Sequence, residues 1–485
     1  MRPRPDGLGR ALALALALAF VLPGCAVGPD YHKPETVSPA AFKEAPVDPS
    51  EWRVAAPDDH LPRGAWWALF GDPGLSALEE EVASANTTIA QAEARYRAAR
   101  AVVRQSRADF YPTVTAGAGV TRARVHTSVP GEAPVVATAT TYSATGDASW
   151  ELDLWGRVRR NVESSVAGAE AAGADLENVR LSMQAELAVD WYQLHGFDAQ
   201  IALLAENAEA QERALKVTRN RHDQGVVSGV DVAQAETLLE ATRAQVIEAR
   251  LSRAQTEHAI AFLVGKAPAD LTIPPAKIAV GPPAVPGLLP SELLERRPDV
   301  ASAERQVAAA NALVGVATAA YFPTVSIDAS AGFVATTLSK LFSAPSFVWS
   351  VGPAALATLF DAGRRRAVTD ERRAEYDAAV AAYRETALRA FQEVEDQLAA
   401  VRLLADEEKQ QAAVVAAAEK AFRLAENRYE GGITTYLEVV TAQTVALSNE
   451  RAAVDILTRR MVASVNLVKA LGGGFEANLA FSNPS

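Results

Sequence analysis

Cysteine is nearly missing from this chain: Cys25 is the only one among 485 residues. One thiol cannot close an internal disulfide, so the cysteine pattern excludes a disulfide-stapled fold. Long apolar runs are also missing, because no stretch of about 20 apolar residues follows the amino-terminal segment. We therefore expect no helix of the mature chain to span a membrane, and any entry into lipid must use strands.

The residues of common active sites are few and scattered. Six histidines show no spacing typical of metal ligands, namely His32, His60, His126, His195, His222 and His258. The chain has no phosphate-binding loop and no nucleophile elbow, so we predict that it is not an enzyme and holds no metal or cofactor. A net charge of −12 argues against nucleic acid as a partner.

Residues 1–24 have the three-part layout of a secretory signal peptide, with three arginines, an apolar run at 11–22 and small residues before Cys25. The letters LPGC resemble the bacterial lipobox, in which the cysteine receives lipid and becomes the first residue of the mature protein. Ala26, directly after it, favours the outer membrane in that class. We predict a lipid such as palmitate on Cys25 and a lipid-anchored outer-membrane protein. A plain secretory signal with an incidental cysteine is the alternative.

The mature chain contains two copies of one large unit. ADFYPTV returns as AAYFPTV 211 residues later, and NRHDQGVVSGVDVAQAE returns as NRYEGGITTYLEVVTAQ 207 residues later. We expect these segments: a signal peptide at 1–24, a lipidated segment at 25–65, a first repeat at 66–265, a Pro-rich connector at 266–297, a second repeat at 298–475 and a tail at 476–485.

Long helices dominate both copies. Residues 156–222 and 362–429 lack proline and are rich in Ala, Leu, Glu, Gln and Arg, which predicts two helices of roughly 100 Å. Shorter helices are predicted at 74–109, 228–265, 299–320 and 434–471. In the first copy the two shorter helices could stack end to end along the long one. A generic bundle or coiled coil is the alternative.

Each copy also contains segments in which apolar and polar residues alternate. Near 113–154 and 323–360 we predict four strands in two hairpins, so the fold class is α+β and mainly α. Four strands cannot close a barrel, since the smallest have about eight, and open edges are not tolerated in lipid. Three copies would supply twelve strands for a water-filled outer-membrane pore. Two soluble hairpins packed on helices are the alternative.

Four motifs, in order, carry a resemblance to a known family: CAVGPDYHKP (25–34), WWALFGDPGLSALEEEVASAN (66–86), LPSELLERRPDVASAE (289–304) and VNLVKALGGGF (465–475). They resemble the outer-membrane efflux lipoproteins of the TolC superfamily, the exit ducts of resistance-nodulation-division pumps. The resemblance implies a homotrimer whose long antiparallel helices form an α-barrel across the periplasm, beneath a shared 12-stranded β-barrel in the outer membrane. The Pro-rich connector would lie in a mixed equatorial band.

The resemblance further implies a passive duct in a tripartite efflux system, and so a role in multidrug resistance. Substrates would pass from an inner-membrane pump and a periplasmic adaptor protein to the outside. An exit duct for protein or peptide secretion, a structural envelope lipoprotein and an enzyme are the alternatives.

Two turns between helices are the remaining candidate sites. Gly225 and Gly432 are predicted to end the long helices as C′ glycines, and Ser228 and Thr435 to begin the next helices as N-caps. In the family these tips gather into a closable iris and meet the periplasmic adaptor.

The acidic residues after the two N-caps are open to two interpretations. Asp231 and Glu438 both complete an S/T-x-x-D/E pattern, which predicts capping boxes. The family often places acidic residues along the pore side of this last helix, and Glu438 matches one such position. The next position, one turn on, is Thr441, so a charged gate ring would be thinner than in acidic relatives. Glu438 is thus expected to gate, to cap its helix, or to do both.

Overall fold

A computed structural model describes residues 26–36, 39, 42–44, 64–127, 135–283 and 296–473. The predicted signal peptide, Cys25 and the tail at 476–485 lie outside the described residues, as do parts of the predicted lipidated segment and connector. The chain divides into two compact units. The first comprises Met1–Glu35, Tyr96–Ala172 and Ala303–Tyr383, and the second comprises Thr36–Arg95, Gly173–Ser302 and Arg384–Ser485.

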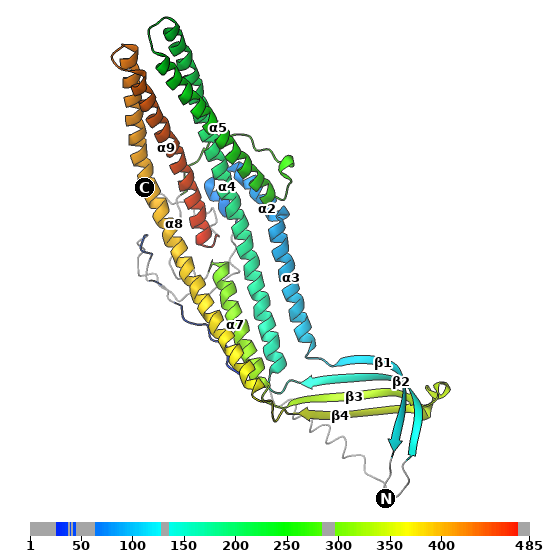
Figure 1. The fold of residues 1–485 in the computed structure, drawn as a ribbon. Helices are drawn as coiled ribbons and strands as arrows, with labels where there is room; N and C mark the ends of the chain where they lie inside the picture. Colours follow the sequence, from blue (N-terminus) through cyan, green and yellow to red (C-terminus); the bar gives the residue numbers. More distant parts are fainter. Residues whose placement is uncertain are drawn as a thin grey trace. The chain divides into compact units, whose positions relative to one another are not determined.

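The first unit contains one antiparallel sheet of four strands (Figure 1), which are β1 (Thr113–Thr127), β2 (Val135–Leu152), β3 (Thr324–Ala335) and β4 (Phe347–Leu356). The strands follow one another in the sheet in the order β1-β2-β3-β4. The four predicted strands are confirmed. The pairing of β2 with β3, which joins the two predicted hairpins into one sheet, was not predicted.

The register of the strands builds one apolar and one polar row across the sheet. Val114 lies opposite Ala148, which lies opposite Ala329, which lies opposite Val351. On the other face the Ser149 hydroxyl donates to the Asp328 carboxylate at 2.6 Å. The predicted alternation is therefore confirmed. Among the described strands, β1 and β4 each pair along one edge only.

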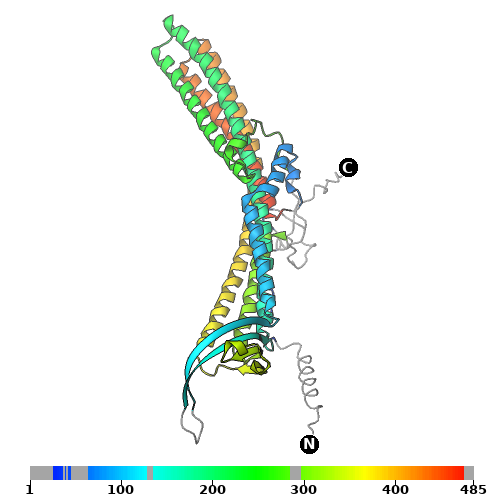
Figure 2. The same ribbon diagram turned by 90° about the vertical axis from the view of Figure 1, so that its right-hand side faces the viewer.

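The four longest helices come in two matched pairs. They are α4 (Arg157–Asp223), α5 (Gly229–Leu263), α8 (Arg364–Glu430) and α9 (Tyr436–Ala470). α4 and α8 both have 67 residues, and α5 and α9 both have 35. Within the second unit, the α4/α5 hairpin and the α8/α9 hairpin lie side by side (Figures 1 and 2). No described helix is both long and apolar enough to cross a membrane.

The remaining helices are shorter. α2 (Pro73–Ala85), α3 (Thr87–Ala108) and α7 (Pro298–Ala319) are accompanied by the 3₁₀ turns η2 (Trp66–Phe70), η3 (Pro268–Asp270), η4 (Leu338–Lys340) and η5 (Ala344–Ser346). The prediction of one helix over 74–109 is wrong, because the chain breaks at Asn86. The Asn86 side-chain oxygen accepts from the backbone N–H groups of Thr88 (2.9 Å) and Ile89 (3.0 Å), which makes Asn86 the N-cap of a new helix.

The broken helix meets the end of α5. The Asn86 amide donates to the Leu263 carbonyl at 2.8 Å, so one side chain both starts α3 and caps α5. In the second copy Arg297 caps the end of α9. Its guanidinium donates to the carbonyl of Ala470, the last residue of α9, at 3.0 Å. These contacts support the predicted end-to-end arrangement of the shorter helices.

The residues just after Cys25 are fastened to the first unit. The Val27 N–H donates to the Trp155 carbonyl at 3.0 Å. Gly28 has φ of 103°, and a Cβ added there would lie 2.5 Å from the Gly315 Cα. Only glycine fits this position, because the backbone is left-handed and a second backbone lies against it.

Glu79 on α2 is a buried acid inside the second unit. Its side chain is fully buried, and neither carboxylate oxygen has a hydrogen-bond partner among the described residues. Desolvation by burial raises the pKa of Glu79 from 4.5 to about 9. The folded chain therefore holds a proton on Glu79 at neutral pH.

We expect Glu79 to make the protein less stable as pH rises. The folded pKa lies above the unfolded one, so stability is complete below the unfolded value of 4.5 and is lost as pH rises toward about 9. The loss is about 1.4 kcal/mol per pH unit, because unfolding then releases one proton. Thermal melts at several pH values should show a flatter pH dependence for Glu79→Gln than for the wild type. The exposed neighbour variant Glu80→Gln should keep the wild-type slope, and parallel slopes for all three proteins would contradict the assignment.

Candidate functional site at the tips of the two helical hairpins

Both hairpins turn through the same backbone motif. Gly225 has φ of 73° and Gly432 has φ of 69°. After α4 the Val226 N–H donates to the Arg221 carbonyl (2.8 Å), and after α8 the Ile433 N–H donates to the Arg428 carbonyl (2.8 Å). This is the Schellman pattern of a C′ glycine, as predicted for both positions.

The first tip also has the predicted capping box. The Asp231 N–H donates to the Ser228 hydroxyl oxygen at 3.3 Å, and the Ser228 N–H donates to the Asp231 carboxylate at 2.9 Å. The two side chains thus satisfy two backbone donors at the start of α5.

The second tip lacks its predicted capping box. Thr435 has the extended backbone of an N-cap, but its side chain makes no capping hydrogen bond. Glu438 instead pairs with Arg428, with 3.5 Å between Nη1 and Oε2, and both side chains are about half exposed. Glutamate is one methylene longer than the matching Asp231, so its carboxylate reaches the arginine at the end of α8. The prediction that Glu438 caps α9 is wrong.

Thr441 lies one turn beyond Glu438. Its side chain is exposed, and its hydroxyl donates to the Leu437 carbonyl of its own helix at 2.8 Å. Thr441 therefore adds neither a charge nor a contact between elements at this tip.

Two tyrosines that were not predicted from the sequence join the hairpins near the tips. The rings of Tyr429 and Tyr436 lie 5.2 Å apart, and the Arg221 guanidinium lies 5.1 Å from the centre of the Tyr429 ring. Tyr436 is buried in a cluster with Leu215 and Leu239 of the first hairpin. The only signal was a difference between the copies, because Tyr429 and Tyr436 stand where the first copy has His222 and Gly229.

Four apolar side chains remain exposed around the tips. Val226 and Ile433 directly follow the C′ glycines, and Val230 and Leu437 lie in the first turns of α5 and α9. All four are more than half exposed, and Ile433 reaches 72%. Exposed apolar residues therefore occur at matching positions on both tips.

The described histidines do not build a metal centre. His195 is buried, and its Nδ1 lies 3.2 Å from Asp198, whose other oxygen pairs with Arg253 at 2.5 Å. The Ala276 N–H donates to Asp198 at 3.1 Å, so this network fastens α5 and the start of the connector to α4. Among the described residues no group of three or more metal-binding side chains comes together.

The chain is similar to known proteins along nearly its whole length. Residues 78–266 and 289–473 match the family described as outer membrane efflux protein. The probable efflux pump outer membrane protein TtgC of Pseudomonas putida is 34% identical over 470 residues, with 96% of each chain covered. The outer membrane protein OprJ of Pseudomonas aeruginosa is 31% identical over 466 residues, with 95% of each chain covered.

Solved structures agree with the sequence matches. The structure of the outer-membrane channel OprN has a TM-score of 0.82 and 35% identity, covering 93% of this chain and 99% of that one. The open-state MtrE channel of Neisseria gonorrhoeae has a TM-score of 0.78 and 28% identity, covering 93% of this chain and 98% of that one.

Four antiparallel strands, matched long helices and an internal repeat define the TolC-like fold. The chain belongs to the outer membrane efflux protein family. It is accordingly an outer-membrane channel component of an efflux pump and not an enzyme.

Two neighbouring glycines in the turn after α8, Gly431 and Gly432, provide a matched pair of variants that tests the left-handed turn. Gly432→Ala forces a side chain into a left-handed conformation, at a cost of about 1 kcal/mol, whereas Gly431→Ala does not, because its φ is not positive. We expect trypsin to cleave after Arg428 about fivefold faster in Gly432→Ala, since local opening becomes easier. Gly431→Ala should be cleaved no faster than the wild type. Equal rates in the two variants would show that the left-handed turn does not hold the tip.

Proposed function

We propose that three copies of this chain form a passive exit duct that carries substrates from an inner-membrane pump and a periplasmic adaptor protein to the outside. The observation that carries the proposal is the four-stranded sheet with two unpaired edges. Unpaired backbone groups cost several kcal/mol each in lipid, so the edges need partners. Three sheets of four strands would close a 12-stranded barrel, with the apolar row outside and the polar row facing water.

Aromatic residues at one end of the sheet support a membrane interface there. Trp155 stacks on Phe322 with 4.8 Å between ring centres, and the Trp150 Nε1 donates to the Phe110 carbonyl at 2.9 Å. Tyr111 beside them is largely exposed. Tyrosine and tryptophan prefer the headgroup level of a bilayer, where one part of the ring is apolar and the other polar.

The position of Ala26 supports lipid attachment at the same level. Gly156 lies four residues after the end of β2, and a Cβ added to it would be 2.8 Å from Ala26. Cys25 is the next residue toward the amino terminus. Acyl chains on Cys25 would thus enter the membrane beside the sheet, and two or more chains give stable anchoring.

Replacement of the thiol tests the anchor. Cys25→Ser should lose all label from a palmitate analogue, because acylation needs the sulfur, and should keep its fold, since serine and cysteine differ in one side-chain atom. Circular dichroism checks the fold. Label retained on the serine variant would show that the lipid is attached to another residue, and an unlabelled wild type would contradict the anchor altogether.

The tips support the adaptor part of the proposal. Val226, Val230, Ile433 and Leu437 offer matched apolar contacts at the same positions of both hairpins. Six such tips in a trimer would present a repeated docking surface to a ring of adaptors. In this arrangement Gly225, Ser228, Gly432 and Thr435 shape the docking turns, and Asp231 stays a cap.

Glu438 is the residue we propose for the periplasmic gate. Three copies of its carboxylate would attract cations to the constriction. The positive charge of Arg428, 3.5 Å from the carboxylate, would weaken this attraction. Wild-type protein in planar bilayers should conduct ions and prefer cations. Glu438→Gln should reduce the cation preference, whereas Arg428→Gln should increase it, because the two changes remove opposite charges from one ion pair. Absence of conductance would contradict the duct, and unchanged selectivity in both variants would leave Glu438 as a surface ion pair.

A further inference from the structure

The apolar face of the sheet changes character along β1. Val114 and Val120 lie on this face, because residues an even number apart along a strand share a face, and they are 73% and 66% exposed. The next two positions on the same face are Arg122 and Arg124. The register of β1 with β2 is unbroken over the whole strand, so no bulge turns the two arginines to the polar face. A row that begins with valine therefore ends in two cations.

This arginine pair, Arg122 and Arg124, has no counter-charge in the described part of the chain. Both side chains are exposed, and neither guanidinium makes an ion pair or a hydrogen bond with another residue that the structure describes. The arginines at the opposite end of the sheet differ. Arg157 pairs with Glu151 at 2.8 Å. Arg365, after the end of β4, pairs with a carboxylate four residues before it at 2.6 Å.

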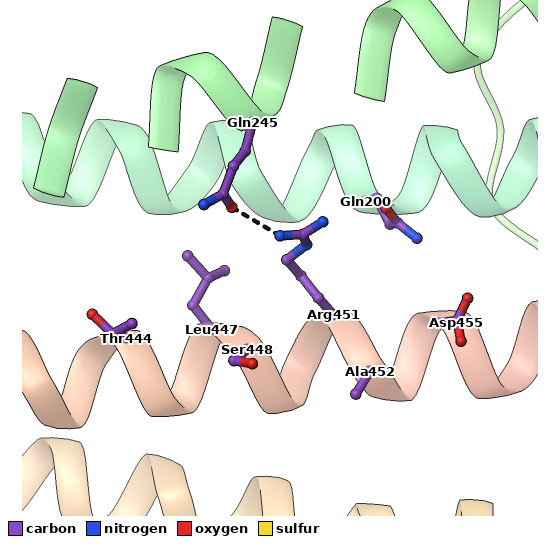
Figure 3. A pocket seen from close by; sticks show the side chains of 8 residues that line it. All are labelled: Gln200, Gln245, Thr444, Leu447, Ser448, Arg451, Ala452 and Asp455. Carbon is purple, nitrogen blue, oxygen red and sulfur yellow. Dashed lines mark hydrogen bonds between the residues drawn. The ribbon is translucent and has the colours of Figure 1, made fainter. Parts of the chain in front are cut away.

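An arginine of the second unit also finds its partner inside the chain. Arg451 on α9 lines a hollow of about 480 Å³, and its Nη1 donates to the Gln245 Oε1 of α5 at 2.9 Å (Figure 3). The guanidinium thus has a neutral amide as its partner where no carboxylate is bonded to it. The arginine pair on β1 has neither kind of partner among the described residues, so its charges are available to a molecule outside the chain.

In the barrel proposed above, the arginine pair would lie at the edge of the lipid-facing band. Arg122 is nine residues beyond Thr113, the first residue of β1. At about 3.3 Å per residue and a strand tilt of about 40°, nine residues rise by about 23 Å, and the apolar band of an outer-membrane barrel is about 25 Å tall. The helices α3 and α4 join the sheet at the other end of β1 and β2. The pair would therefore lie at headgroup level in the leaflet remote from the helices, where an arginine on the lipid face is tolerated.

The second half of the sheet has aromatic rings at the matching position. β1 and β3 start 211 residues apart, so Arg122 corresponds to Phe333. The Phe333 ring centre lies 5.4 Å from that of Phe342 and 5.5 Å from that of Phe347, and both of these neighbours are exposed. Aromatic side chains gather at the two interfaces of a membrane barrel. In a barrel built from repeated hairpins, counterparts lie at the same level, so this aromatic cluster supports an interfacial position for Arg122.

We propose that Arg122 and Arg124 bind a phosphate group of lipid A, the acylated and phosphorylated glycolipid of the outer leaflet, and hold this lipid against the barrel. The inference rests on the trimeric duct proposed above, because a closed barrel turns this face of the sheet toward lipid. The acyl chains of the bound lipid would then lie along Val120 and Val114, on the same face.

The chemistry of the pair fits a phosphate. A guanidinium donates two parallel hydrogen bonds to a phosphate group, and such charge-assisted bonds are stronger than neutral ones. Residues two apart on one strand face are separated by about 7 Å, so two arginine side chains can reach one phosphate between them. A lipid that carries both phosphate and acyl chains matches the cations and the valines of this face at the same time.

Binding of fluorescently labelled lipid A to the full-length protein in detergent tests the contact. The double variant Arg122→Gln/Arg124→Gln should bind lipid A about tenfold more weakly than the wild type, because both phosphate-binding cations are removed. Lipid A without its phosphates should bind equally to the two proteins, and more weakly than intact lipid A binds to the wild type. Raising the salt concentration should reduce the difference between the two proteins, since exposed charges are screened.

A matched control separates this contact from a change in net charge. Arg97→Gln/Arg104→Gln removes the same charge from exposed positions of α3, outside the sheet, and should bind lipid A as tightly as the wild type. Circular dichroism and light scattering check that each variant keeps the fold and the mass of the wild type. Should the double variant on β1 fail that check, the single variants Arg122→Gln and Arg124→Gln replace it, each with an expected loss of about threefold.

The outcomes distinguish the lipid contact from the duct itself. A trimeric wild type that binds lipid A no more tightly than Arg122→Gln/Arg124→Gln would overturn the contact and leave the duct standing. An equal loss in the α3 control would also overturn it, and so would full displacement of lipid A by millimolar inorganic phosphate, which would show a site for the free ion. A monomeric mass of the wild type by light scattering would overturn the proposed trimer together with the contact.

Discussion

The backbone hydrogen bonds at the two edges of the sheet are the constraint on which the remaining structure depends. β1 and β4 are paired on one side only, and Val114 and Val351 of the apolar row are exposed. In lipid, an open edge leaves polar groups unsatisfied, and only a closed sheet avoids that cost. The trimer that we propose satisfies the edges without adding any strand to the chain.

The duplication gives the second unit its two hairpins. Small sequence differences between the copies give the two hairpins different contacts. Asn86 and Arg297 cap α5 and α9 with different chemistry. At the tips, Arg221 lies over Tyr429, whereas its counterpart Arg428 pairs with Glu438. The first arginine thus joins the two hairpins, and the second stays available to balance a charge at the proposed gate.

Much of this architecture could be predicted from local sequence pattern. The predicted helix at 156–222 differs by one residue at each end from α4, because composition and a C′ glycine mark its limits. The Ser228 capping box could also be predicted, since it depends on four consecutive residues. The break at Asn86 was missed, because helix-forming residues on both sides outweigh one N-cap signal.

Contacts between distant segments could not be predicted in the same way. Nothing local indicates that β2 pairs with β3, or that Arg221 lies over Tyr429 of the other copy. The Glu438 carboxylate pairs with Arg428, which lies before the turn, instead of with the backbone N–H of the N-cap residue Thr435. A capping pattern alone does not include that competitor.

Hydrogen exchange of the strand amides in detergent tests the shared sheet most directly. The amides of β1 and β4 that do not bond to β2 or β3 within the chain would be bonded to neighbouring copies in a closed barrel. They should therefore exchange as slowly as the amides of the central strands β2 and β3. Fast exchange along the outer edges of β1 and β4, with slow exchange in β2 and β3, would contradict the closed barrel.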